Sequence, residues 1–297
     1  MVYNWLLEKK PLYFNFWFWF ALLYISIQNL LVFKATPEII ALQFAILILF
    51  LRRNQFHKYL KDWLPFIGFF LLYEFLRGFA DNYSPFYETT LFWIYRVEKA
   101  LFPVLPTVYL QAKFMGNALV LNLAYFFYSI FFYYSFLAAF IIWLKNQRDF
   151  VDYSRKLIVM SFIGLLFFFL IPTAPPWLVA EKFTVPIERP IYQNMTLYRH
   201  GTLLYHFVKK NPVAALPSLH VAWPMFTSLF LIKKFKQRYS YLLLIIPLAI
   251  GFSVVLTGEH FLLDVIAGYL LAFAVFIPSN RRGEPDTKSP KSGRSPR

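Results

Sequence analysis

Two short stretches organise this chain: Ala-Leu-Pro-Ser-Leu-His at residues 215–220 and Gly-Glu-His-Phe-Leu-Leu-Asp at residues 258–264. Both place polar residues at the edge of segments that are otherwise apolar. In the first stretch, a serine and a histidine stand where a helix can begin just after a proline. In the second, His260 and Asp264 are four residues apart, so on a helix they share a face and can touch. We expect the two stretches to meet in one polar site.

The composition indicates a membrane protein. Of the 297 residues, 59% are hydrophobic and 22% aromatic, and the mean hydropathy is +0.51, which is too apolar for a soluble domain. Several apolar runs approach or exceed the ~20 residues that a helix needs to cross the hydrocarbon core. The fold class is therefore an all-α polytopic bundle. The chain has no cysteine, which excludes a disulfide framework, a thiol nucleophile and a cysteine-bound metal.

Eight transmembrane helices are predicted from the apolar runs, at about residues 12–33, 39–51, 63–79, 118–144, 157–171, 218–232, 241–257 and 260–278. Residues 89–102 mix aromatic and charged side chains, a pattern typical of a helix that lies at the membrane interface. We divide the chain into two N-terminal helices (1–62), a membrane-embedded catalytic core of six helices (63–278) and a basic tail (279–297). The tail lacks apolar periodicity, and we expect it to be disordered.

The basic residues predict the orientation in the membrane. If the loops are numbered alternately from the N-terminus, one set holds 20 of the 30 lysines and arginines, in short segments and the tail. Under the positive-inside rule this set is cytoplasmic, together with both termini. The two polar stretches then lie at the outer face of the cell membrane. The net charge of +15 is explained by these loops and the tail, and indicates contact with anionic membrane lipids, not with nucleic acid.

The polar residues have the chemistry of phosphoryl transfer. An imidazole can attack a phosphoester if a carboxylate fixes its tautomer, and a second acid must protonate the leaving oxygen. His260 with Asp264 supplies the first pair, and His220 supplies the acid. Ser218, near a helix N-terminus, offers a hydroxyl and backbone N–H groups to phosphate oxygens. A His-x-x-x-Asp pair is often a simple one-turn contact, but polar residues in membrane spans are costly and are functional by default.

The same residues resemble signature motifs of a known family. Leu-Pro-Ser-Leu-His220 and His260-Phe-Leu-Leu-Asp264 are similar to the second and third motifs of the type-2 phosphatidic acid phosphatase superfamily. The Pro-Ser-Leu-His variant, and Pro172-Thr-Ala-Pro-Pro-Trp177 before it, resemble the branch that contains inositol phosphorylceramide synthase. The resemblance covers about residues 63–277. It implies that His260 is a nucleophile that forms a phosphohistidine, Asp264 its orienting partner and His220 the general acid, with no metal or other cofactor.

One phosphate-binding residue of that pattern is absent. The third motif usually carries Ser-Arg, with the arginine six residues before its histidine, but this chain has Ser253 and Val254 there. Another cation must then meet the phosphate charge. Lys182 and Arg189 reproduce the Lys-x6-Arg-Pro spacing of the first motif, although they lie in an outer loop. Arg77, with Glu74 one turn back, is either a paired structural ion or a site cation.

We therefore predict an integral-membrane, inositolphosphotransferase-like enzyme that acts on a lipid-linked phosphate at the outer leaflet, with a possible alcohol acceptor. The alternatives are a lipid phosphate or polyprenyl (pyro)phosphate phosphatase and, from another class, a non-catalytic transporter or channel. A transporter would distribute polar residues through the bilayer midplane, whereas here they concentrate at one face.

Two further predictions concern side-chain exposure. Glu98 and Gln111 either shape a headgroup pocket or face water, and the aromatic runs at 125–128 and 131–134 are expected to face lipid.

Overall fold

The structure is a computed structural model that describes residue 23 and residues 37–51, 53–80, 86–191 and 212–277. Within these residues the chain is an all-α helical bundle, as predicted, and contains no β-strand. The predicted span at 12–33, Leu23 excepted, and the predicted tail at 279–297 lie outside the described part. The elements are α3 (Pro37–Leu51), η1 (Arg53–Gln55), α4 (Phe56–Arg77), α5 (Tyr87–Thr90), α6 (Trp93–Leu101), α7 (Pro106–Phe114), α8 (Ala118–Lys145), α9 (Gln147–Leu170), α10 (Pro176–Phe183), α13 (Leu219–Phe235), η3 (Arg238–Leu244), α14 (Ile245–Leu256) and α15 (Leu262–Phe276).

Three of the described helices are long and apolar enough to cross a membrane. They are α8, α9 and the segment Arg238–Leu256, which joins η3 to α14. The apolar helix α15 is shorter. The predicted interfacial segment at 89–102 forms the short helices α5 and α6. The total of eight spans stays a prediction.

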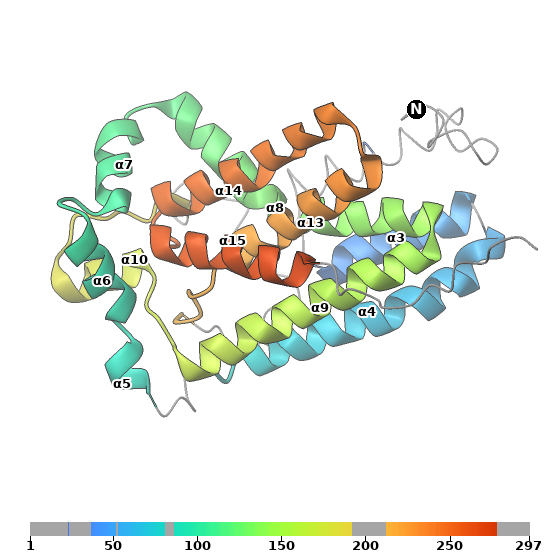
Figure 1. The fold of residues 1–297 in the computed structure, drawn as a ribbon, viewed down its shortest axis with the longest axis horizontal. Helices are drawn as coiled ribbons and strands as arrows, with labels where there is room; N and C mark the ends of the chain where they lie inside the picture. Colours follow the sequence, from blue (N-terminus) through green and yellow to red (C-terminus); the bar gives the residue numbers. More distant parts are fainter. Residues whose placement is uncertain (1–22, 24–36, 52, 81–85, 192–211, 278–297) are drawn as a thin grey trace, which may run out of the picture.

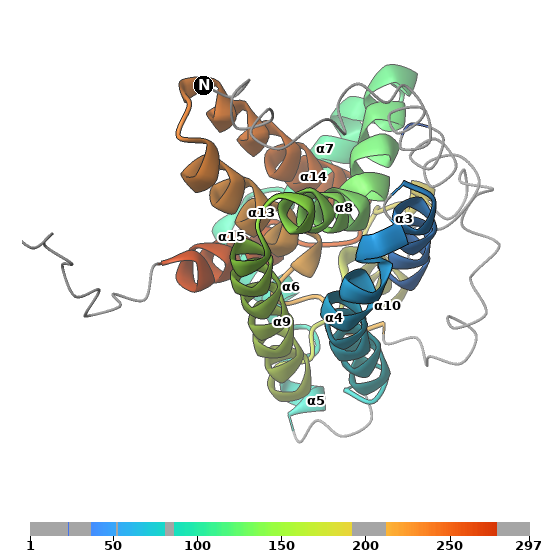
Figure 2. The same ribbon diagram turned by 90° about the vertical axis from the view of Figure 1, so that its right-hand side faces the viewer.

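Helix α13 occupies the middle of the bundle and packs against α8, α9, α14 and α15 (Figures 1 and 2). Its buried residues include the large side chains of Trp223 and Phe226. Helices α3 and α4 pack against each other, and α4 also packs against α9. Since α13 carries the first polar stretch at its N-terminus, that stretch is positioned by contacts with four other helices.

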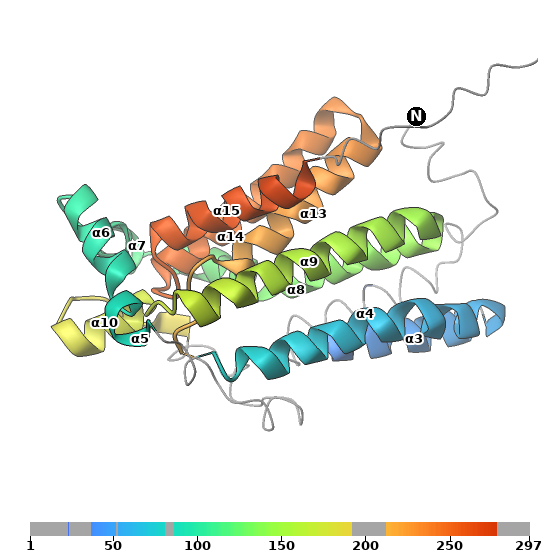
Figure 3. The same ribbon diagram turned by 60° about the horizontal axis from the view of Figure 1, so that its bottom comes forward.

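The two ends of the bundle differ in character. At one end lie the short connections between α3 and α4, between α8 and α9, and between α13 and η3, which carry basic residues (Figures 1 and 3). At the other end gather the short helices α5, α6, α7 and α10 and the turn from α14 to α15. The polar stretches at 215–220 and 258–264 lie at this second end, at the start of α13 and in the turn before α15.

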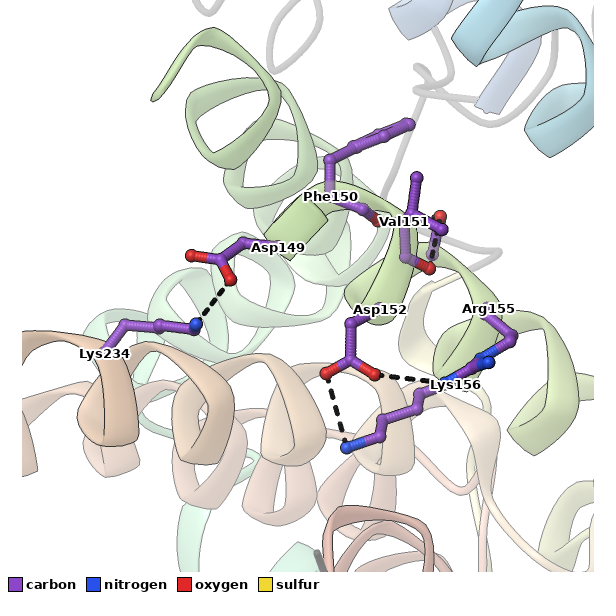
Figure 4. Close-up of polar contacts among 8 residues, drawn as sticks. Asp149, Phe150, Val151, Asp152, Arg155, Lys156 and Lys234 are labelled. Atoms are coloured by element: carbon purple, nitrogen blue, oxygen red, sulfur yellow. Dashed lines mark hydrogen bonds and ion pairs between the residues drawn. The ribbon is translucent and has the colours of Figure 1, made fainter. Parts of the chain in front are cut away.

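Helix α9 begins at Gln147, ten residues before the predicted start of its span at 157. The charges that we assigned to a loop lie instead on the first turns of the helix, where they find partners. Asn146 caps the helix, because its side-chain oxygen accepts hydrogen bonds from the N–H groups of residues 148 and 149. Figure 4 shows Asp149 paired with Lys234 of α13, and Asp152 with two basic residues three and four positions later.

Buried and partly buried polar side chains join the long helices. The hydroxyl of Tyr153 on α9 donates to the carbonyl oxygen of Ser135 on α8, at 2.9 Å, and lies 2.7 Å from the hydroxyl of Thr227 on α13. The carboxylate of Asp62 on α4 accepts hydrogen bonds from the side chains of Trp143 and Gln147. Such contacts hold apolar helices in one register, because an unpaired polar group is costly in an apolar interior.

Candidate active site

The site forms where the N-terminus of α13 meets the N-terminus of α15. The backbone N–H of Ser218 donates to the carbonyl oxygen of Asp264 at 3.0 Å, which joins the two polar stretches directly. Gly268, one turn further along α15, allows this approach. A β-carbon there would overlap the carbonyl oxygen of Ser218 and the side chain of Val221. The two helices can therefore place their first turns side by side.

The two histidines are in direct contact. Nδ1 of His220 and Nε2 of His260 lie 3.0 Å apart, a hydrogen-bonding distance in which one ring nitrogen donates and the other accepts. His260 is buried, with 5% of its surface exposed, whereas His220 is partly exposed. The structure thus brings together two residues that are 40 positions apart and that the sequence placed in one site.

The contact between His260 and Asp264 differs from the expected one. The two residues do not share a helical face, because His260 precedes the first residue of α15 and Asp264 lies in its first turn. The N–H groups of Glu259 and His260 both donate to the carbonyl oxygen of Val254, so the chain is still turning at the histidine. Oδ2 of Asp264 lies 3.6 Å from Nδ1 of His260 and accepts its hydrogen bond from the N–H of Phe261 instead.

Aromatic rings from α8 hold the outer histidine. The ring of Tyr128 stacks on His220 with 5.3 Å between centroids, and the ring of Phe131 lies 4.3 Å from it. Both aromatic side chains are buried, as is Tyr133. The prediction that residues 125–128 and 131–134 face lipid is therefore wrong for these three, and Tyr128 and Phe131 pack on the site instead. Aromatic faces stabilise a cation placed over them.

Arg189 lies against the turn that precedes His260. Its guanidinium makes two hydrogen bonds to the carboxylate of Glu259, at 2.7 and 3.0 Å, and stacks 3.9 Å from the ring of Trp177. Gly258, with φ of +74°, leaves room for the backbone of Glu188 beside it. No sequence pattern points to Glu259 as the partner of Arg189, because the two residues are 70 positions apart.

The remaining predicted phosphate ligands have different surroundings. Ser218 is fully buried, and its hydroxyl has no hydrogen-bond partner among the described residues. Its backbone N–H, which we expected to face phosphate, bonds Asp264 instead. Lys182 is exposed at the end of α10. Arg77, at the end of α4, forms an ion pair with Glu74 at 2.8 Å, the structural alternative considered for it.

Glu98 and Gln111 are both buried, so neither faces water. The side chain of Gln111 joins the segment around Glu188 to the end of α14, with hydrogen bonds to the backbone of Glu188 and to the carbonyl oxygen of Leu256. Glu98 has no exposed surface, and its Oε2 accepts a hydrogen bond from the N–H of Leu263 at 3.0 Å. Burial, with a smaller contribution from the nearby charge of Asp264, raises the pKa of Glu98 from 4.5 to about 7.

This raised pKa predicts how stability depends on pH. In the unfolded chain the Glu98 carboxyl loses its proton near its ordinary pKa of 4.5, whereas in the folded chain it keeps the proton up to about pH 7. The free energy of unfolding should therefore fall by up to about 3 kcal/mol as the pH rises through this window, and then stay level with respect to this group. Glu98→Gln, which cannot ionise, should lack this component. Chemical unfolding of both proteins at pH 4.5, 6 and 8 measures the difference, and parallel curves would contradict it.

A family model described as the PAP2 superfamily matches residues 92–277, nearly two thirds of the chain. The chain belongs to the PAP2 superfamily. The matched part begins just before α6 and contains both polar stretches, the two histidines and Glu98. No curated protein and no solved structure shows a significant match to the chain.

Membership in the PAP2 superfamily identifies an enzyme of the phosphatase type in a membrane protein. The matched residues include the three described helices that are able to cross a membrane. The histidine contact lies inside this PAP2 part.

Proposed function

We propose that this PAP2 protein is a membrane phosphotransferase that acts on a lipid-linked phosphate through a phosphohistidine at His260. The observation that carries the proposal is the 3.0 Å contact between Nδ1 of His220 and Nε2 of His260. It places a candidate acid beside the nitrogen that would attack phosphorus, as a nucleophile and its proton-transfer partner require.

The tautomers follow from the neighbouring groups. Asp264 lies on the Nδ1 side of His260, which favours a proton on that nitrogen and leaves the lone pair on Nε2. The hydrogen bond between the histidines then requires His220 to donate through Nδ1. In this assignment His260 holds the nucleophilic nitrogen and His220 holds the proton for the leaving group, while Tyr128 and Phe131 support a positive charge on His220.

The reaction has two steps. Nε2 of His260 attacks phosphorus, the bond from phosphorus to the leaving oxygen breaks, and His220 gives that oxygen a proton. Water or an alcohol then attacks the phosphohistidine, His220 takes the proton of the incoming hydroxyl, and the nitrogen–phosphorus bond breaks. In both steps Asp264 stabilises the positive charge that develops on the His260 ring. Water as acceptor makes the enzyme a phosphatase, and an alcohol makes it a transferase.

Arg189 is the cation that we assign first to the phosphate. It is half-buried and adjoins the residue before His260, and its pairing with Glu259 and Trp177 holds it in place. Lys182 and Arg77 remain weaker candidates, and the Ser218 hydroxyl a further ligand. This set would compensate for the third-motif arginine, whose position holds Val254, a buried residue with its carbonyl oxygen engaged in the turn.

The finer assignment is inositolphosphotransferase-like, and it rests on the Pro-Ser-Leu-His variant of the second motif. The alternation of basic loops supports both termini in the cytoplasm, the site at the outer leaflet of the cell membrane, and contact of the loops and tail with anionic lipids. A phosphatase for a lipid phosphate or polyprenyl (pyro)phosphate is the second candidate, favoured because the same site would accept water.

Turnover by the purified full chain tests this proposal. Mixed micelles would contain a glycerolipid monophosphate, a polyprenyl diphosphate or an inositol phospholipid, each with and without a ceramide as alcohol acceptor. We expect headgroup transfer to the acceptor to exceed release of inositol phosphate to water. Release of phosphate alone would support the phosphatase instead. If no substrate in the panel were turned over, while a PAP2 phosphatase assayed in parallel was active, the proposed function would be wrong.

A further inference from the structure

The N-cap residue of helix α15 supplies no capping hydrogen bond. Its N-cap position is Phe261, which has no side-chain hydrogen-bond acceptor, although such positions are usually Ser, Thr, Asp or Asn. Only two side-chain oxygens meet the N–H groups of its first turn in the described part of the chain. Asp264 Oδ2 accepts from the N–H of Phe261, and Glu98 Oε2 accepts from the N–H of Leu263. The second of these comes from another helix, α6.

Glu98 is the charged residue on the buried face of α6. Ile94 and Tyr95 share that face and pack in a small apolar cluster with Phe261 and Val179. The carboxyl group is thus enclosed by apolar side chains, and its Oε1 has no hydrogen-bond partner in the part that the structure describes. An ionisable group is rarely buried in such surroundings without a role, because its desolvation is costly.

The charge that acts on Glu98 comes from α15 and not from the other helices packed near it. On α15, Asp264 is the residue whose charge acts on it. On α5 and α10, the charged side chains are exposed, and so are the other two charges of α6 itself, Arg96 and Lys99. Glu98 is therefore coupled to the first turn of α15 and to the carboxylate that adjoins His260.

We propose that Glu98 is a positioning residue for the reaction: by capping α15 from α6, it holds the first turn so that Asp264 stays beside His260. The carboxylate of Asp264 has only a 3.6 Å contact with the imidazole, so a small shift of the turn changes that distance. The backbone of Asp264 is also the acceptor for Ser218, so the same turn sets the spacing between the two polar stretches. The inference rests on the proposed function, because it assumes that His260 is the reacting group.

The test compares Glu98→Ala and Glu98→Gln with the matched control Glu88→Ala, which removes an exposed glutamate on the adjoining helix α5. All are full-length chains assayed with the substrate that wild type turns over. We expect Glu98→Ala to lower kcat at least tenfold and to change KM less than twofold, because positioning acts on the chemical step. Glu98→Gln keeps an acceptor for the Leu263 N–H and should recover most of kcat. Glu88→Ala should match wild type.

Amide hydrogen exchange separates this inference from the proposed function. Exchange at residues 261–265 should be faster in Glu98→Ala than in wild type and in Glu88→Ala, and near the wild-type rate in Glu98→Gln, whether or not a substrate is known. Two results would overturn the positioning role. One is an exchange rate at residues 261–265 of Glu98→Ala that equals the wild-type rate. The other is a kcat of Glu98→Ala that equals the wild-type kcat, measured with a substrate that wild type turns over. If Glu98→Ala does not fold, Glu98→Gln and Glu98→Leu replace it in the comparison, and equal kcat values for these two would overturn the role. Failure of wild type to act on the lipid panel counts against the proposed function alone.

Discussion

His260→Ala should abolish turnover, with a loss of about 10⁴-fold or more in kcat and little change in the affinity for substrate. The reason is that the covalent route needs a nitrogen nucleophile, and the variant has none in contact with His220. Residual activity would come only from the charges that bind phosphate. The fold should persist, since the side chain makes no hydrogen bond beyond the one to His220 within the described residues.

Two measurements check this prediction. Steady-state release of phosphate or transfer of the headgroup gives kcat, and acid quenching of wild type with labelled substrate should trap an acid-labile phosphate that His260→Ala lacks. The matched control is His57→Ala, which removes an exposed histidine of α4. If His260→Ala kept more than about a tenth of wild-type turnover, His260 would not be the nucleophile.

His220→Ala should lower kcat by about 10²–10⁴-fold for substrates with an alkyl leaving group, because general acid catalysis contributes about that much. The loss should depend on the leaving group. An aryl phosphate has a good leaving group and needs little protonation, so the variant should still form the phosphohistidine from it. Since His220 is also the base for the second step, the intermediate should then accumulate.

The informative measurement is thus the ratio of kcat for the aryl phosphate to kcat for the alkyl phosphate, in wild type and in His220→Ala. Wild type should prefer neither leaving group by a large factor, whereas His220→Ala should prefer the aryl phosphate by at least about tenfold and retain labelled phosphate on the protein. Phe131→Leu, which keeps His220 but removes a ring that contacts it, should show a smaller version of the same pattern. An equal loss with both substrates and no trapped phosphate would contradict the role of His220 as acid.

Much of the bundle could be predicted from the amino-acid pattern. The apolar runs mark every described helix longer than ten residues, because the part of a helix that crosses the hydrocarbon core needs a long run of apolar residues. The start of α9 was misplaced, since the pattern of charges there resembles a loop. Those charges are satisfied by Asn146 and by pairs on the helix and with α13, and only the packed structure shows these partners.

In the candidate site, too, the sequence predicts which residues take part, and only the structure shows how they contact one another. The sequence identified His220, His260 and Asp264, because polar residues at the edge of apolar spans stand out. It could not determine the distance between the histidines, nor that Asp264 approaches His260 across the start of α15. The aromatic rings around His220 were assigned to lipid, since the same residue types suit a lipid-facing surface and a buried one.

By itself, the sequence determined the all-α membrane class, and it is the basis for predicting which residues carry phosphoryl transfer. Both depend on composition and on short spacings along the chain. Only the tertiary structure decided which distant groups pair: Arg189 with Glu259 across 70 positions, and Glu98 with the N–H of Leu263 across 165. The physical reason is that hydropathy describes how one segment partitions between water and lipid. A hydrogen bond between segments depends on how their helices pack and on the conformation of each side chain.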